Sequence, residues 1–85
     1  MAGGADPGQT SNQRDTANQM LDATEANLKK LAGKQLTPNQ QDMVSQTRQF
    51  MQQSKAAVEA GDLERARTLA WKAQVLSEEL VKPKE

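Results

Sequence analysis

The chain has 85 residues, with 11 Lys and Arg against 11 Asp and Glu, so its formal charge is zero. This length allows one small domain, the charge balance lacks the basic excess of nucleic-acid binders, and the absence of a long apolar run excludes a transmembrane helix. The sequence contains no Cys, His or Tyr, which excludes disulfides, thiolate chemistry, imidazole bases and the usual zinc ligand sets.

Residues 1–14 are rich in Gly, Pro and polar residues and show no apolar periodicity, which predicts a disordered tail or linker. A first helix is predicted over 16–32. Thr16 followed by Gln19 fits a capping box at its start, and Gly33 fits a left-handed cap at its end. Its apolar side, an arc of about 120°, contains Ala17, Met20, Leu21, Thr24, Leu28, Leu31 and Ala32.

A second helix is predicted over 38–60, and its start is the strongest local signal in the chain. Thr37 is a good N-cap, Pro38 takes the first helical position, and Gln40 completes a second capping box. The residues on one side of this helix span about 140°; they are Met43, Val44, Thr47, Phe50, Met51, Ser54, Ala57 and Val58.

A third helix is predicted over 63–81. Gly61 can adopt the positive φ that ends the preceding helix, Asp62 caps the new one, and Pro83 ends it, leaving 83–85 as a short tail. The apolar arc again spans about 140° and contains Leu63, Ala66, Leu69, Ala70, Ala73, Leu76, Ser77, Leu80 and Val81.

Three amphipathic helices joined by short connections predict an all-α fold, an antiparallel three-helix bundle over residues 15–82. The very short connection makes the second and third helices an antiparallel hairpin. Because each apolar arc is wide enough to touch two neighbours, the first helix is expected to pack across both of the others.

The segment GDLERARTLAWKA resembles the turn and second helix of a tetratricopeptide repeat. Gly61 falls on the turn glycine of that family, Ala66 and Ala73 fall on its small positions, and Phe50 stands where its first helix prefers Trp. A single repeat brings no peptide-binding groove, because such repeats bury their faces against stacked neighbours. The alternative is that Ala66, Ala70 and Ala73 are small only because two helices approach closely beside a tight turn.

A broader stretch, residues 16–82, is similar to the C-terminal regions of uncharacterised bacterial secreted proteins and lipoproteins. This resemblance covers LAGKQLTPNQQ and the segment from QSKAAVEAGD to the end of the third helix. It implies a periplasmic or cell-envelope location and a longer parent protein, and it implies no activity.

Trp71 is the one large apolar residue predicted on the polar face of its helix, with Val75 one turn further on and Arg67 one turn before. Exposed aromatic residues are typical of contact surfaces, so Arg67, Trp71 and Val75 are the candidate partner contact. The alternative is an isolated surface aromatic, or one that folds over the edge of a groove.

No residues of the sequence suggest catalysis. The adjacent carboxylates of Glu78 and Glu79 point in different directions on a helix, and there is no phosphate-binding loop, nucleophile with a base, cofactor motif or metal set. We therefore expect a non-catalytic domain for protein interaction or structure, without enzyme activity. Two alternatives stay open: self-association through Trp71 across a two-fold axis, and a carrier that holds a small apolar ligand between its helices.

Overall fold

In the computed structural model, which describes the backbone of residues 7–82 and the side chains of residues 12–82, the chain forms three helices. They are α1 (Pro7–Lys30), α2 (Pro38–Glu59) and α3 (Leu63–Val81). The predicted all-α antiparallel three-helix bundle is confirmed. The bounds of α3 agree with the sequence prediction, and α2 ends one residue before the predicted position 60.

The start of α2 has the predicted capping geometry. The backbone N–H of Gln40 donates to the Thr37 hydroxyl at 3.1 Å, and the backbone N–H of Thr37 donates to the Gln40 side-chain oxygen at 2.8 Å. Pro38 occupies the first turn, where its missing N–H removes no intrahelical bond. These local interactions fix where the chain re-enters a helix after the connection over 31–37.

The two connections between helices each contain a glycine in the left-handed region. Gly33 has φ +80° and Gly61 has φ +79°, values that other residues adopt only with strain. After Gly61, the Asp62 carboxylate accepts a hydrogen bond of 3.4 Å from the backbone N–H of Arg65. The chain thereby reverses direction within a few residues, and α2 and α3 become an antiparallel hairpin.

The prediction for the start of α1 was wrong. The helix begins at Pro7, so residues 7–14 belong to it and not to a tail. The Thr16 hydroxyl donates to the carbonyl of Asn12 at 2.8 Å, a bond made within a continuing helix, and Thr16 is therefore no N-cap. The rest of the predicted tail, 1–6, and the end at 83–85 lie outside the described residues.

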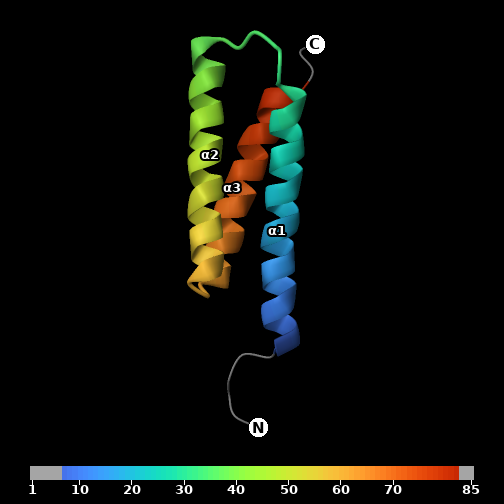
Figure 1. Cartoon of the computed structure of the whole chain (residues 1–85), viewed down its shortest axis with the longest axis vertical. Coiled ribbons are helices and arrows are strands. Elements are labelled where there is room, and N and C mark those ends of the chain that lie inside the picture. Colours follow the sequence, from blue (N-terminus) through green and yellow to red (C-terminus); the bar gives the residue numbers. More distant parts are fainter. Residues whose placement is uncertain (1–6, 83–85) are drawn as a thin grey trace.

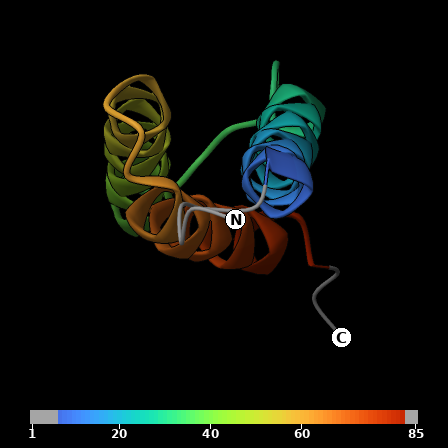
Figure 2. The ribbon, with the colours of Figure 1, turned by 90° about the horizontal axis from the view of Figure 1, so that it is seen from below.

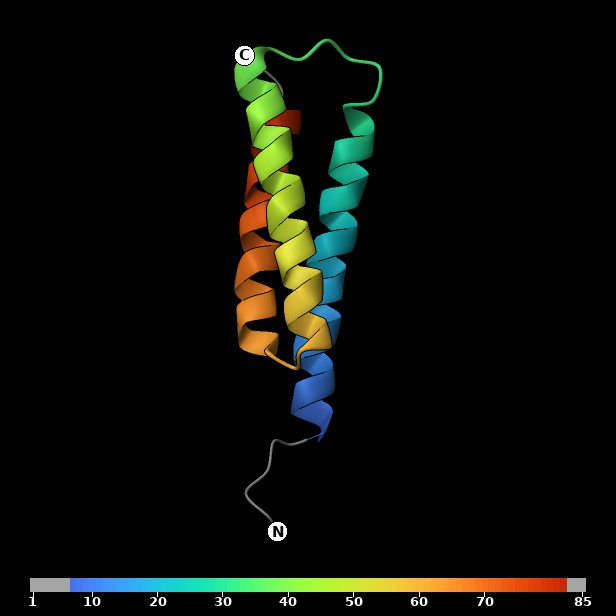
Figure 3. The ribbon, with the colours of Figure 1, turned by 60° about the vertical axis from the view of Figure 1, so that its left-hand side comes forward.

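The helices alternate in direction, and α3 packs against both of the other helices. Figure 1 shows α1 and α3 running upward and α2 running downward, so α1 is parallel to α3. The α3 helix packs closely against both others, whereas α1 and α2 share few contacts. The end-on view in Figure 2 shows α1 and α2 set apart on one side of α3, and Figure 3 shows the connection that joins their upper ends. The first helix therefore contacts both others, as expected, but unequally: α1 packs mainly along α3 and touches α2 at few points.

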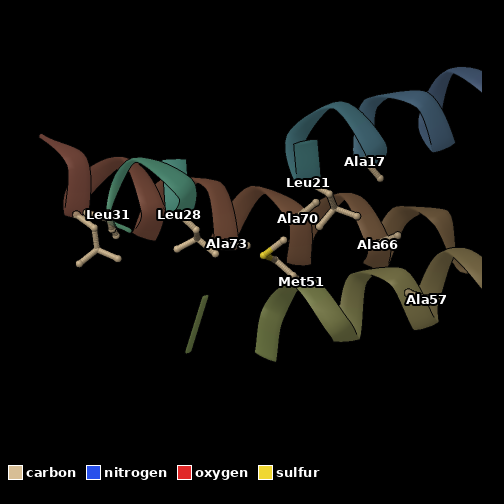
Figure 4. Close-up of a cluster of buried hydrophobic side chains, with 10 residues drawn as sticks. Ala17, Leu21, Leu28, Leu31, Met51, Ala57, Ala66, Ala70 and Ala73 are labelled. Atoms are coloured by element: carbon tan, nitrogen blue, oxygen red, sulfur yellow. The ribbon is translucent and has the colours of Figure 1, made fainter. Parts of the chain in front are cut away.

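Small residues on α3 explain this central position. Ala66, Ala70 and Ala73 have no exposed surface, and a helix with such a face can approach two neighbours closely because few side-chain atoms intervene. Larger side chains come from the flanking helices. Figure 4 shows Leu21 of α1 and Met51 of α2 directed toward α3 near Ala70.

The completely buried hydroxyl groups all have hydrogen-bond partners. Two of them donate to the carbonyl four residues earlier: Thr24 to Met20 and Thr47 to Met43, each at 2.7 Å. The Ser54 hydroxyl instead crosses from α2 to the carbonyl of Ala66 on α3. Among the described residues no buried side-chain polar atom lacks a hydrogen-bond partner. The interior therefore contains polar groups, and these groups are hydrogen-bonded within the protein.

Ser77 connects α3 to α1. Its hydroxyl donates to the carbonyl of Gln74 at 2.8 Å and accepts a hydrogen bond of 3.0 Å from the side-chain amide of Asn27 on α1. This bond fixes the axial position of α1 against α3, because sliding either helix would leave a buried hydroxyl without its donor.

Candidate functional site

The outer side of α3 carries the candidate contact residues. The opposite side of the helix is closed against α1 and α2 by its buried residues, which are Leu63, Ala66, Leu69, Ala70, Ala73, Ser77 and Leu80. At 3.6 residues per turn, Trp71 cannot join that face. The structure leaves 56% of the Trp71 surface and 38% of the Val75 surface exposed, and Arg67 is exposed beside them.

A groove between α1 and α3 borders Trp71 on one side. It has a volume of about 550 Å³ and is lined by Gln13, Met20, Glu64, Arg67, Thr68 and Trp71. Four of these residues lie on α3 and are themselves exposed, so the groove opens to solvent along its length. Trp71 and Met20 supply its apolar surface, while Glu64 and Arg67 supply charges of both signs.

A smaller hollow between α2 and α3 borders Trp71 on the other side. It measures about 250 Å³ and is lined by Gln46, Phe50, Trp71, Lys72, Val75 and Leu76. The Lys72 ammonium lies 5.8 Å from the centre of the Phe50 ring, within the range of a cation–π contact. Trp71 is thus the shared wall of two depressions, one toward each neighbouring helix.

Sequence reasoning missed the contributions of Met20 and Phe50. Both were predicted to face the core, and both do pack against it, but each is only partly buried. Each therefore fills the core edge and also lines a depression on the outer side. A residue at the margin of a wide apolar arc is exposed or covered depending on how its neighbouring helix is placed, which the arc does not specify.

The charged groups of the surface around Trp71, namely Glu64, Arg67 and Lys72, are all exposed. Glu64 is the one carboxylate among the lining residues of the two depressions. In the part of the chain that the structure describes, no group of three or more His, Cys, Asp or Glu residues could hold a metal ion. Within that same part, none of the helices combines the length and the apolar character needed to cross a bilayer.

Neither a protein-family model, nor a curated protein, nor a solved structure matches the chain.

Proposed function

We propose that this domain is a non-catalytic interaction module whose contact surface is the outer face of α3 around Trp71. The observation that carries the proposal is the exposure of Trp71 on a helix whose other side is already fully packed. Tryptophan is strongly enriched where proteins contact one another, and an indole in water gains free energy when a partner covers it.

The two depressions beside Trp71 support a polypeptide partner in preference to a small ligand. Small-molecule sites enclose most of the ligand within a largely apolar cavity, whereas the α1–α3 groove has an exposed wall with Glu64, Arg67 and Thr68. An apolar centre with charges at its margin is instead the pattern of protein–protein contacts.

Site-specific photocrosslinking tests the proposal directly. A photoreactive amino acid in place of Trp71 should give a discrete crosslinked product with a polypeptide when the full chain is expressed in its native host. The matched control places the same group at Gln52, an exposed position on α2. Equal, diffuse labelling from both positions would show that the Trp71 surface has no preferred partner and would overturn the proposal.

A further inference from the structure

The outward residues of α3 carry an ordered series of charges around an apolar centre. Six positions, here called the outer ridge, fall within about 80° of the helical wheel at 100° per residue. All are exposed, and in chain order they are Glu64, Arg67, Trp71, Val75, Glu78 and, directly after the last residue of α3, Lys82. The Lys82 ammonium lies 3.6 Å from the Glu79 carboxylate, an exposed ion pair of small net energy that a carboxylate of a second copy can replace. Their character is therefore negative, positive, apolar, apolar, negative, positive.

When the series is read from Lys82 back to Glu64, each charged position carries the opposite charge to the corresponding position of the forward series. If a second outer ridge is laid antiparallel on the first, Glu64 faces Lys82 of the second copy, Arg67 faces Glu78, and Trp71 faces Val75. A two-fold axis repeats each of these pairs, as isologous contacts require. The ridge is thus electrostatically complementary to itself in one register.

Other arrangements of the same two ridges bring like charges together. In a parallel pairing related by a two-fold axis, each charged residue would face its own copy. In an antiparallel pairing centred on Trp71, Glu64 would face Glu78. Displacing the self-complementary register by one turn in the opposite direction would place Arg67 opposite Lys82. Like charges in direct opposition suppress wrong pairings. Among these arrangements, only the register with Trp71 opposite Val75 gives every charged residue of the outer ridge an opposite charge to face.

We infer that the occupant of the Trp71 surface is a second copy of this chain, bound antiparallel through the outer ridge of α3 with Trp71 against Val75. The inference rests on the proposed function and specifies its partner. In this register each indole lies beside the other copy's hollow lined by Phe50, Lys72 and Leu76. The Lys72 ammonium, already near the Phe50 ring, is then also placed close to an incoming indole.

The expected dimer is weak and salt-dependent. The ridge from Glu64 to Lys82 is about 27 Å long at 1.5 Å per residue, so the contact falls at the small end of specific interfaces. Its four charge pairs lie at the margin, where raising the ionic strength from about 0.01 M to 1 M shortens the screening distance from about 30 Å to 3 Å. Salt should therefore shift the equilibrium toward monomer.

Sedimentation equilibrium of the full chain from about 1 μM to about 1 mM measures the association over the dissociation constants of weak complexes. We expect a monomer–dimer equilibrium at low salt. Trp71 is the only tryptophan, so its fluorescence emission should move to shorter wavelength over the same concentrations as the indole leaves water. A strict monomer throughout, with unchanged emission, would overturn the inference.

A charge exchange tests the register. Arg67→Glu places a carboxylate opposite the second copy's Glu78, and Glu78→Arg places a guanidinium opposite the second copy's Arg67. Each single variant should weaken dimerisation about tenfold or more, since two attractive pairs become repulsive. The double variant restores both pairs with reversed polarity and should recover the wild-type dissociation constant within about threefold.

The controls separate this inference from the proposed function. Arg48→Glu makes the same change at an exposed position of α2 and should leave dimerisation unchanged. If the double variant dimerises more weakly than either single variant, that result would contradict the register.

If the chain is monomeric and photocrosslinking from position 71 captures a different protein, the second-copy inference fails while the interaction function stands. If neither association nor crosslinking occurs, both fail.

Discussion

The Ser54 hydroxyl on α2 donates a hydrogen bond of 2.7 Å to the main-chain carbonyl of Ala66 on α3. Both residues have no exposed surface. Because a serine hydroxyl lies close to its own backbone, this bond forms only where the backbones of the two helices lie close together. The contact between α2 and α3 is therefore defined as much by backbone proximity as by apolar packing.

Removal of this hydroxyl should produce a modest loss of stability. A carbonyl inside a helix keeps its partner four residues further on, so Ser54→Ala leaves the Ala66 carbonyl bonded. We expect the free energy of unfolding to fall by about 1 kcal/mol, measured by urea denaturation. Ser45→Ala, at an exposed position on the same helix, should change it by less than about 0.5 kcal/mol. Equal effects of the two substitutions would contradict a structural role for the bond.

Enlarging the small face of α3 should be more damaging than removing the hydroxyl. Ala70 is completely buried where Leu21 and Met51 converge, so Ala70→Leu has no space for its added carbons. We expect a loss of about 1–3 kcal/mol in the free energy of unfolding. Thermal unfolding would record it as a fall in Tm of several degrees. Ala26→Leu, on the exposed side of α1, is the matched control and should leave Tm nearly unchanged.

The two threonines that fit capping boxes in the sequence should respond differently to substitution. Thr37→Ala removes the acceptor for the Gln40 backbone N–H and should destabilise the domain by about 1 kcal/mol. Thr16 lies inside α1 and bonds the carbonyl of Asn12, so Thr16→Ala should change stability by less than about 0.5 kcal/mol. Chemical denaturation of both variants checks the comparison, and a larger loss for Thr16→Ala would place the helix start near residue 16 after all.

Trp71 should contribute little to the stability of the isolated chain. With more than half of its surface exposed, Trp71→Ala is expected to lower the free energy of unfolding by no more than about 1 kcal/mol. Leu69→Ala, two positions earlier on the buried face, should lower it by about 2–5 kcal/mol. Urea denaturation at protein concentrations of a few micromolar, where self-association is least, provides the measurement. A loss for Trp71→Ala as large as that for Leu69→Ala would show that the indole belongs to the core.

Much of the fold could be predicted because its signals are local. Thr37, Pro38 and Gln40 define the start of α2 through bonds within one turn, and Gly61 with Asp62 defines the reversal before α3. Such interactions depend on residue type and spacing alone. The buried sides of the helices also followed from periodicity, including the hydroxyl groups of Thr24 and Thr47.

The start of α1 and its placement could not be predicted by the same means. The residues before Thr16 are polar but compatible with a helix, and without an apolar stripe they leave no periodic signal. An apolar arc of about 120° on a helix suits contact with one neighbour or with two. What decides the placement is the small face of α3 with Ser77 bonded to Asn27, a tertiary contact between residues far apart in the sequence.

The candidate site was found in part. The wheel position of Trp71 predicted its exposure, and the structure places Arg67 and Val75 on the same outer side. The two depressions beside Trp71 depend on where α1 and α2 lie against α3, so Gln13, Met20 and Phe50 could be assigned to them only from the structure. Association through the Trp71 surface remains a prediction.

Four hydroxyl side chains, those of Thr24, Thr47, Ser54 and Ser77, are completely enclosed among the buried leucine and alanine residues. Unfolding therefore hydrates these hydroxyl groups together with the hydrocarbon of the core. Apolar hydration raises the heat capacity of the unfolded chain and polar hydration lowers it. The four hydroxyl groups should accordingly reduce the heat-capacity increment of unfolding measured by calorimetry, relative to the same bundle with apolar side chains at these positions, and flatten the dependence of its stability on temperature.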